Sequence, residues 1–289
     1  MRDELVTALG EEAVAAVAGR AAVTLQTATA ARELTALCRA RGWRLHPWAG
    51  GPPAPDLPAE AVLVRPGGEI AGEFRLAAED YYCEVPAPLT LAELRERLAA
   101  ERRWFPFACP GGGAMTAGEV VARYPANAFG RAHGELPRLL LGVVFLNDEG
   151  DVVATGRRTL KGVAGYDLAK LFLGSRGRTG LILRARFRLF RRPPQAAFWR
   201  ARGGEAGRYR SESRLCAVEA GGETLLYADG PAADVEALAA RLREAGCRFA
   251  GDERGAEAAR AFAEAVEALP PPAPGPPPPA GPALTELFI

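Results

Sequence analysis

Apolar positions near the start of the chain recur first at helical and then at strand-like spacing. From Glu4 to Val17 they predict an amphipathic helix that ends at Gly19, and from about Ala30 to Arg41 they predict a second helix. Between these two helices lies the short apolar run Ala22 to Leu25, and after them Trp43 to Trp48 is strand-like. Alternation of strand and helix of this kind predicts an α/β layer.

Two helix-start signals stand in the middle of the chain. A strand is expected from Asp80 to Val85, and the capping box Thr90 to Glu93 opens a helix that runs to about Arg102. A second box, Thr116 to Glu119, follows the run Gly111 to Gly113. A glycine-rich loop at a helix N-terminus offers backbone amides and a favourable dipole to an anion such as a phosphate.

Further along, the pattern favours a hairpin and an alternating strand. Leu139 to Leu146 and Asp151 to Thr155 flank the turn Asn147 to Gly150. From Leu183 to Leu189 the apolar residues alternate with arginines, so one face is expected to pack and the other to be solvated or to meet a charged partner. The run of arginines from Arg184 to Arg192 has few interleaved aromatic residues, which favours subunit docking over nucleic-acid binding.

Pro193 and Pro194 indicate a boundary, after which the chain predicts a smaller α+β unit. Strands are expected from Arg214 to Ala228, and helices from Asp234 to Ala245 and from Gly255 to Ala268. We therefore divide the chain into residues 1–195, 196–268 and a tail, 269–289. In the tail, nine of the thirteen positions 270–282 are proline, which favours an extended segment of about 40 Å before the apolar residues 284–289.

Composition narrows the class of protein. Lysine and arginine number 36 against 35 acidic residues among 289, so no charge imbalance suggests a nucleic-acid or membrane partner. The five cysteines are odd in number and form no CxxC pair, which favours free buried thiols in a reducing compartment. No signal peptide or membrane span is expected. A cytoplasmic location follows, with membrane association through partners as an alternative.

Glycine-rich turns are the strongest candidates for a ligand site. The chain has no GxxxxGK[ST], and no GxGxxG follows its first strand, which argues against a P-loop or a dinucleotide-binding Rossmann turn. Four other glycine-rich turns, at residues 49–51, 111–113, 162–165 and 174–180, spread over about 140 residues and could wrap one large cofactor. Each turn alone is more typical of an ordinary surface turn.

The order of these turns carries a family resemblance. The stretch KGVAGYDLAKLFLGSRGRTGLILRARFRLF, residues 161–190, is similar to KNVAGYDLxxLxxGSxGxLGxIxxxxxxL of the vanillyl-alcohol-oxidase (PCMH-type) FAD-binding family. Within that family it most resembles the FAD-binding (GlcE-like) subunits of bacterial glycolate oxidases. GWRLHPWAGG at 42–51 looks like the strand and turn that hold the FAD diphosphate. The resemblance covers residues 20–195 well and 210–268 loosely.

This resemblance implies an α+β fold, with a two-lobed PCMH-type FAD-binding domain followed by a small truncated α+β cap. It implies a noncovalent FAD between the lobes, and an accessory role in electron transfer or assembly within a glycolate or 2-hydroxyacid oxidase complex. The implied partners are a catalytic flavoprotein subunit and an iron–sulfur subunit. The implied cofactor-binding residues are Trp48, Ala49, Gly50, Gly51, Gly111, Thr116, Gly118, Gly130, Gly134, Val163, Gly165, Tyr166, Asp167, Gly180 and Ile182. For Asp167, a turn or helix cap is an equal alternative to a cofactor contact.

Several residues depart from the family pattern and keep a second hypothesis open. Pro52 and Pro53 remove two amide donors after Gly51, and Glu119 stands where a second glycine is expected. Three more differences are Gly162 for asparagine, Arg176 for a small or acidic residue and Arg138 for aspartate. The alternative is a flavin-free scaffold that keeps the fold for complex assembly.

The histidines limit the expected chemistry. His46 and His133 are the only two in the chain and lie far apart in sequence, so the histidine pairs that bind metal or substrate in related subunits are absent. We expect structural roles for both histidines. We therefore predict no metal site and no catalytic residues, and an oxidase that acts alone is the least expected function.

Overall fold

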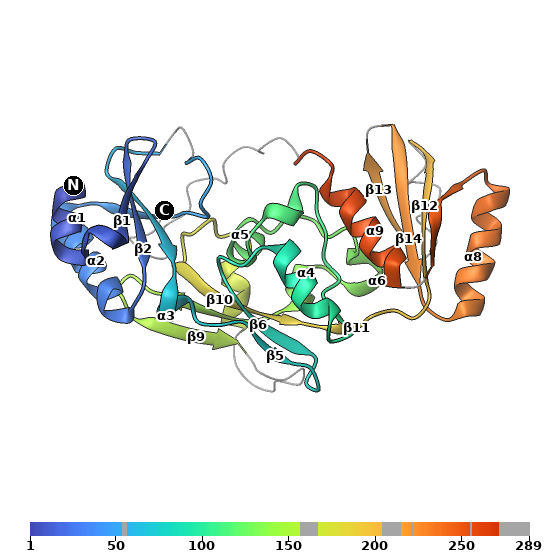
Figure 1. The fold of residues 1–289 in the computed structure, drawn as a ribbon, viewed down its shortest axis with the longest axis horizontal. Helices are drawn as coiled ribbons and strands as arrows, with labels where there is room; N and C mark the ends of the chain where they lie inside the picture. The colour runs from blue at the N-terminus through green and yellow to red at the C-terminus, as the bar shows by residue number, and fades with distance from the viewer. Residues whose placement is uncertain (54–56, 157–166, 204–214, 221, 255, 272–289) are drawn as a thin grey trace.

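A computed structural model describes residues 1–53, 57–156, 167–203, 215–220, 222–254 and 256–271. Figure 1 shows three parts in a row, which follow the order of the chain. Helices α1 and α2 with strands β1 and β2 lie at one end, β5, β6 and β10 lie in the middle, and β12 to β14 with α8 lie at the other end.

The first part is a four-stranded sheet in the order β1-β2-β4-β3. Strands β2, β4 and β3 are parallel, while β1 pairs with β2 in antiparallel fashion. The side chain of Thr27 accepts a hydrogen bond from the amide of Ala30 at the start of α2, and α2 ends at Gly42 in the left-handed conformation. The elements of this part are α1 (Arg2–Leu9), β1 (Val14–Val17), β2 (Arg20–Leu25), α2 (Ala28–Arg41), β3 (Arg44–Pro47), β4 (Ala61–Pro66) and α3 (Gly68–Ala71).

The helix predicted from Glu4 to Val17 is wrong in its second half. Helix α1 ends at Leu9, a single 3-10 turn follows at Glu11–Ala13, and Val14–Val17 forms strand β1. Ala18 and Gly19 both adopt positive φ, which makes a tight turn and lets β1 pair back onto β2. This pairing buries Val14 beside the core, so tertiary contacts override the helical spacing of the apolar residues. The strand predicted around Trp43 to Trp48 is confirmed as β3.

The second part is a five-stranded antiparallel sheet in the order β5-β6-β10-β8-β9. Its hairpin turn was predicted correctly, and the side chain of Asn147 accepts hydrogen bonds from the amides of Glu149 and Asp151. Both predicted capping boxes are present, at Thr90 and Thr116. The longer elements are β5 (Arg75–Ala77), β6 (Tyr82–Pro86), α4 (Leu91–Ala99), α5 (Ala117–Arg123), β8 (Leu140–Leu146), β9 (Val152–Gly156) and β10 (Leu181–Arg188).

Short elements connect these strands. They include the two-stranded sheet of β7 and β11, and four single-turn helices. Their bounds are β7 (Arg103–Trp104), η2 (Gly112–Ala114), α6 (Gly130–His133), α7 (Leu136–Leu139), η3 (Leu168–Phe172) and β11 (Phe190–Arg191). Together with α4 and α5 they pack one apolar core onto the sheet, in which Phe107, Val120 and Phe187 are buried.

The arginines of β10 find their charged partner on the next strand. Arg184 and Arg186 pair with the Glu84 carboxylate of β6, at 3.2 and 2.6 Å. The guanidinium of Arg188 lies 4.8 Å from the ring centroid of Phe190. Contacts inside the chain therefore explain the alternation, and subunit docking through the arginine run stays a prediction.

The third part, which we name the cap-like unit (residues 196–268), is a separate antiparallel sheet in the order β13-β14-β12-β15. Trp199 and Leu226 pack with α8 on one face, whereas Phe198 and Tyr227 pack with α9 on the other. The elements are β12 (Ala196–Arg202), β13 (Cys216–Ala220), β14 (Glu223–Asp229), α8 (Ala232–Glu244), β15 (Arg248–Arg254) and α9 (Ala256–Glu267). Both helices lie within two residues of their predicted bounds, while the division into three domains stays a prediction.

All five cysteines are buried and free, as the sequence predicts. Within the ranges described above, no helix is both long and apolar enough to cross a membrane, and no group of three potential metal-binding side chains occurs.

Candidate cofactor site

The parallel strands of the first sheet have their carboxyl ends on the same side, and the turn Trp48 to Gly51 directly follows β3, the outermost of them. The indole N–H of Trp48 donates to the carbonyl of Gly51 at 2.6 Å, and Gly50 has φ +105°. The Arg65 guanidinium at the end of β4 lies 5.1 Å from the Trp48 ring centroid. In open α/β sheets, ligands bind outside the carboxyl ends of the strands, so this turn is placed to contact one.

The glycine loop at residues 174–180 packs directly against this region. A Cβ on Gly177 would lie 2.6 Å from Cγ of Pro47, and its φ of +87° also disfavours a side chain. The same loop binds α5, since the amide of Gly174 donates to the carbonyl of Val121 and that of Arg176 to Ala122, both at 3.0 Å. The loop therefore brings the end of β3 beside α5. Two turns that the sequence predicts as cofactor contacts meet here.

The N-terminus of α5 is held against the second sheet. The amide of Gly118 donates to the carbonyl of Ala87 at 3.0 Å, and a Cβ on Gly118 would lie 3.0 Å from Cβ of Ala87. Glu119, the departure noted in the sequence, accepts from the Thr116 amide at 3.0 Å and pairs with Arg123 at 2.9 Å. Its carboxylate is thus neutralised locally, which reduces the repulsion expected for a nearby phosphate.

Behind this helix, two predicted residues fix the start of β10. Ile182 is buried in the core against α5. Gly180 has φ +130°, and a Cβ there would lie 2.5 Å from the carbonyl oxygen of Leu146. Both residues position the glycine loop whether or not they also contact a cofactor.

Two hydroxyls of the same loop lack hydrogen-bond partners. Among the described residues, the buried Ser175 Oγ and Thr179 Oγ1 atoms bond to no protein atom, and Thr179 is only 9% exposed. Leaving such a group unsatisfied costs about 1–3 kcal/mol. A polar ligand at this loop would satisfy them. These orphaned hydroxyls, the glycine backbone and a nearby guanidinium fit a cofactor that is rich in oxygen atoms and anionic.

Gly130 and Gly134 lie in a different turn, built around Asn127. The Asn127 side chain accepts from the amides of Ala108 and Phe129 and donates to the carbonyls of Pro106 and Gly134. A Cβ on Gly130 would collide with the Glu135 carboxylate, and one on Gly134 would lie 3.0 Å from Cδ of Arg138. A side chain at Gly130 would have to displace the Glu135 carboxylate, and Gly134 has φ +96°, which favours glycine. The contact of both glycines with a flavin stays a prediction.

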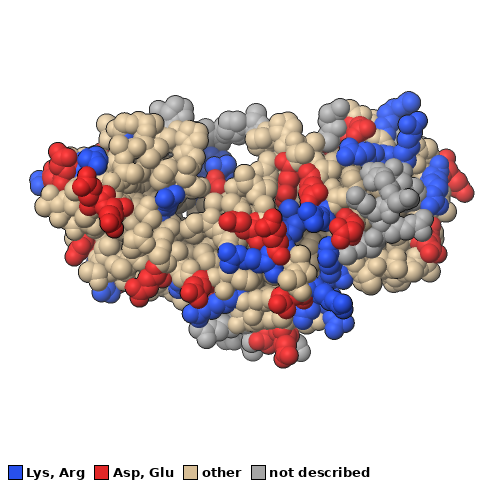
Figure 2. Space-filling model, viewed as in Figure 1, with Lys and Arg blue, Asp and Glu red and all other residues tan. Residues whose placement is uncertain are grey.

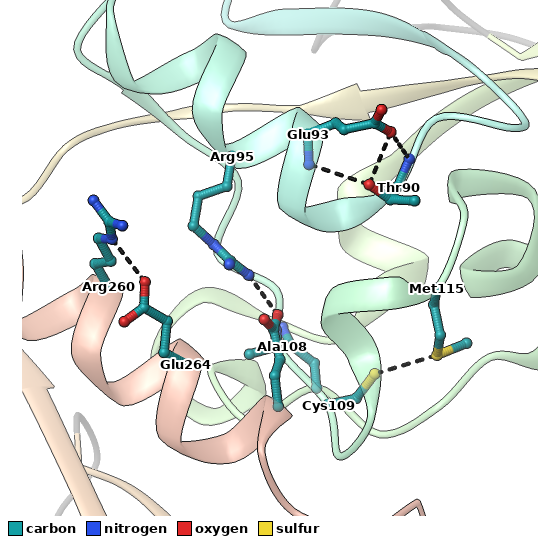
Figure 3. Close-up of polar contacts among 10 residues, drawn as sticks. Thr90, Glu93, Arg95, Ala108, Cys109, Met115, Arg260 and Glu264 are labelled. Carbon is teal, nitrogen blue, oxygen red and sulfur yellow. Dashed lines mark hydrogen bonds and ion pairs between the residues drawn. The ribbon is translucent and has the colours of Figure 1, made fainter.

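Gly111 supports the end of helix α9. Its amide donates to the carbonyl of Glu267 at 3.1 Å, and a Cβ on Gly113 would lie 3.0 Å from the Glu267 carboxylate. Arg95 reaches from α4 and pairs with Glu267 (Figure 3). Burial raises the pKa of Glu267, which the Arg95 guanidinium partly offsets. The predicted anion-binding turn thus already contacts a carbonyl and a carboxylate of the chain, and its contact with FAD stays a prediction.

The last group of predicted residues comes from the VAGYD stretch, of which the structure describes only Asp167. Val163, Gly165 and Tyr166 lie outside the described residues. Asp167 flanks the N-terminus of η3, where its side chain makes no capping hydrogen bond but pairs with Lys170 at 3.5 Å. Asp167 thus stands at the N-cap position of η3, and both the turn-or-cap alternative and a cofactor contact stay predictions.

One polar cluster between the second sheet and the cap-like unit was not predicted from the sequence. Nε2 of His133 lies 2.6 Å from Oδ2 of Asp229, which also accepts from the Tyr227 hydroxyl at 2.7 Å. The ring of Trp104 is 4.7 Å from that of His133. His133 thus has the structural role that the sequence predicts, but 96 residues separate it from Asp229 and no motif links them.

No protein-family model matches the chain. Among curated proteins, it is 33% identical over 118 residues to the mitochondrial D-lactate dehydrogenase [cytochrome] of Arabidopsis thaliana, covering 41% of the chain and 20% of that protein. It is 36% identical over 64 residues to glycolate oxidase subunit GlcD of Bacillus subtilis, covering 22% of the chain and 14% of that protein. The matches thus span a fifth or less of these relatives' length, and they relate the chain to FAD-dependent oxidoreductases.

Solved structures are similar over most of the chain. The isoeugenol complex of 4-ethylphenol oxidase from Gulosibacter chungangensis has a TM-score of 0.66 at 13% identity, covering 93% of this chain and 69% of that one. Xylooligosaccharide oxidase from Myceliophthora thermophila C1 has a TM-score of 0.61 at 15% identity, covering 84% and 55%. The fold is that of the PCMH-type FAD-binding proteins. The fold class predicted from the sequence is confirmed, whereas the GlcE-like assignment rests on the motif alone.

Proposed function

We propose that this chain is an accessory, FAD-binding subunit of a glycolate or 2-hydroxyacid oxidase complex, with a catalytic flavoprotein subunit and an iron–sulfur subunit as partners. The observation that carries the proposal is the loop at 174–180, which packs on Pro47 beside the Trp48 to Gly51 turn through Gly177 and binds α5 through the amides of Gly174 and Arg176. The likeness in fold and the sequence relatives support FAD as the cofactor.

Residues at this junction would hold the cofactor without a covalent bond. Gly50 and Gly51 offer close backbone approach, and Ser175 and Thr179 offer hydroxyls that lack protein partners. The residue directly after Gly51 is Pro52, so no histidine stands there to form a covalent flavin link. When bound, FAD would supply hydride or single-electron transfer.

An accessory role is favoured because the cap-like unit packs closely on the second sheet. Phe262 and Val266 of α9 are fully buried in one cluster with Phe129 and Tyr227. The ring centroids of Phe129 and Phe262 are 5.1 Å apart. His133, the histidine in this seam, is engaged with Asp229. A substrate would have to displace this packing, so we assign substrate oxidation to the partner subunit.

A flavin-free scaffold is the second candidate. Pro52 and Pro53 lack the amide donors of a diphosphate-binding turn, and the Gly111 turn is in contact with α9. Under this hypothesis the fold serves complex assembly only.

Spectroscopy of the purified chain separates the two candidates. The chain is purified alone, titrated with FAD, and followed by flavin absorbance and by quenching of flavin fluorescence. We expect stoichiometric uptake of FAD, released intact on denaturation, and no glycolate turnover without the partners. A colourless protein that takes up no FAD, alone or in its complex, would overturn the cofactor assignment in favour of the scaffold. Glycolate turnover by the isolated chain would overturn the accessory role.

A further inference from the structure

We infer that Arg65 is the cationic contact for the diphosphate of the bound flavin nucleotide. This inference rests on the proposed function, because it names a residue for the same site. No part of the family resemblance assigns a role to this position.

Two contacts hold the Arg65 side chain at the edge of the first sheet, and a third distance places it beside Gly50. Its Nε donates to Oγ1 of Thr24 on the neighbouring strand at 3.0 Å, and its guanidinium lies over the Trp48 ring at 5.1 Å. Its Nη1 atom is 3.6 Å from the position that a Cβ on Gly50 would occupy. The guanidinium is therefore held beside the glycine turn, with Nη1 the atom nearest to Gly50 among those that a Cβ there would meet.

The guanidinium charge is not compensated by a nearby carboxylate. Arg65 is exposed, and within the ranges that the structure describes it forms no ion pair. Other arginines there pair with acidic groups, among them Arg32, Arg39, Arg41, Arg95, Arg123, Arg184, Arg186, Arg192, Arg200 and Arg260. An anionic ligand at this edge would complete the contacts of the side chain, since a guanidinium presents paired donors that suit phosphate oxygens.

The backbone beside Arg65 lacks donors that a diphosphate would need, and Arg65 can supply them. A diphosphate carries negative charge that a binding turn usually neutralises with amide N–H groups, and Pro52 and Pro53 cannot donate any. The ends of β2, β3 and β4 meet at the same edge, and the loop at Gly177 packs against Pro47 beside it. A fixed cation at this edge can replace the two missing donors.

The alternative is a purely structural role, in which Arg65 only packs on Trp48 and holds its ring against the sheet. We call this alternative the brace. Cation–π contacts of exposed arginines are common and contribute about 0.5–1 kcal/mol. A brace would affect the stability of the chain and all ligands equally. A diphosphate contact would instead affect only ligands that carry phosphate.

The test compares phosphate-bearing and phosphate-free ligands on the full chain. FAD, ADP and adenosine are titrated by calorimetry into the wild type, R65Q, R65K and the exposed control R75Q. Hydrogen bonds to charged groups contribute about 1.5–3 kcal/mol, so R65Q should weaken FAD and ADP by roughly tenfold or more. Adenosine should bind R65Q as it binds the wild type, R65K should recover part of the loss, and R75Q should lose nothing. The dependence of ADP affinity on salt should also be weaker in R65Q.

The outcomes separate this inference from the proposed function. If the wild type binds no FAD, the cofactor assignment fails, and Arg65 fails with it. If the wild type binds FAD and R65Q binds it equally well, only the role of Arg65 is overturned. Equal losses for adenosine and ADP in R65Q, together with a lower melting temperature, would identify the brace and reject the diphosphate contact.

Discussion

Nε2 of His133 lies 2.6 Å from Oδ2 of Asp229, which joins α6 on the second sheet to the last residue of β14 in the cap-like unit. Both side chains are only 13% exposed, and Tyr227 donates to the same carboxylate oxygen. Burial raises the pKa of Tyr227, and the negative charge of Asp229 raises it further, so the phenol stays a donor at all ordinary pH values. This cluster is one of several polar links across the seam, together with the Arg95–Glu267 pair and the hydrogen bond from the Gly111 amide to the Glu267 carbonyl.

Removing the shared acceptor should destabilise the protein more than removing one donor. D229A leaves His133 and Tyr227 buried without a partner, and we expect a loss of about 2–4 kcal/mol in the free energy of unfolding. Y227F removes a single hydrogen bond and should cost about 1 kcal/mol. Denaturant unfolding followed by tryptophan fluorescence measures both. Equal losses for the two variants would contradict a shared role for Asp229.

The Glu84 carboxylate should contribute more to the free energy of unfolding than a surface carboxylate does. Arg184 and Arg186 both depend on it, and Arg186 is 10% exposed. E84Q should lower the free energy of unfolding by about 2 kcal/mol or more, because it removes the negative charge that both nearly buried guanidinium groups contact. D151N provides the control, since Arg32 and Asp151 are 66% and 50% exposed, and it should cost less than about 0.5 kcal/mol. A larger effect in D151N would reverse this ranking.

Gly177 should couple the glycine loop to flavin binding. G177A places a methyl group 2.6 Å from Pro47 and should push the loop away from the β3 end, lowering FAD affinity by roughly tenfold or more. G19A has a similar positive φ but no atom within 4 Å of its Cβ position, so it tests backbone strain alone. Fluorescence titration with FAD gives the two affinities. The coupling is rejected if G177A binds FAD as well as G19A does.

The contact between α9 and the Gly111 turn should strengthen in acid. Because burial raises the pKa of Glu267 above its usual 4.5, the folded state favours the protonated carboxyl, and this stability is present below pH 4.5. It is lost as pH rises through the raised pKa. Relative to E267Q, the wild type should therefore lose stability as pH rises above about 4.5 and through the raised pKa.

Glu93 supplies a control of opposite sign for this experiment. Its hydrogen bonds with the Thr90 amide and hydroxyl lower the pKa of Glu93, so its contribution is present at neutral pH and is lost as pH falls through the lowered pKa. Unfolding of the wild type, E267Q and E93Q is compared from pH 3 to 7, about the range of carboxyl titration. If the free energy of unfolding, relative to the wild type, changed with pH in the same direction for E267Q and E93Q, the raised pKa of Glu267 would be ruled out.

The cysteines should be unreactive in the folded protein. Burial raises the pKa of the Cys38, Cys109 and Cys216 thiols to about 12, and it also raises that of Cys83. Because the thiolate is the reactive form, iodoacetamide at pH 8 should label no cysteine of the native chain and all five after unfolding. Mass spectrometry counts the adducts. Fast labelling of Cys109 in the native chain would show that α9 opens from the Gly111 turn.

Local signals in the sequence predicted much of the fold. The capping boxes at Thr90 and Thr116 and the turn at Asn147 each act within a few residues, so they form as the sequence predicts. The strand Val14–Val17 was predicted wrongly because its partner β2 decides its conformation. Helical spacing of small apolar residues cannot show that such a partner exists.

The candidate site was predicted less completely, because it depends on distant contacts. The turn at Gly50 and the loop at Gly177 stand out as glycine-rich segments, and the structure brings them together. Arg65 belongs to no motif, and it becomes a candidate only because the structure places it beside Trp48 and Gly50. The hydrogen bond from the Gly111 amide to the Glu267 carbonyl likewise joins residues more than 150 positions apart.

Helix α9 has a consequence for how the molecule folds. Its buried side chains belong to the same cluster as Ala108 and Phe129, so the cap-like unit and the second sheet share part of one core. Two parts that share a core unfold together, since neither can lose its packing without exposing apolar surface on the other. The chain should therefore melt in one calorimetric transition across this seam, and the cap-like unit expressed by itself should not be stable.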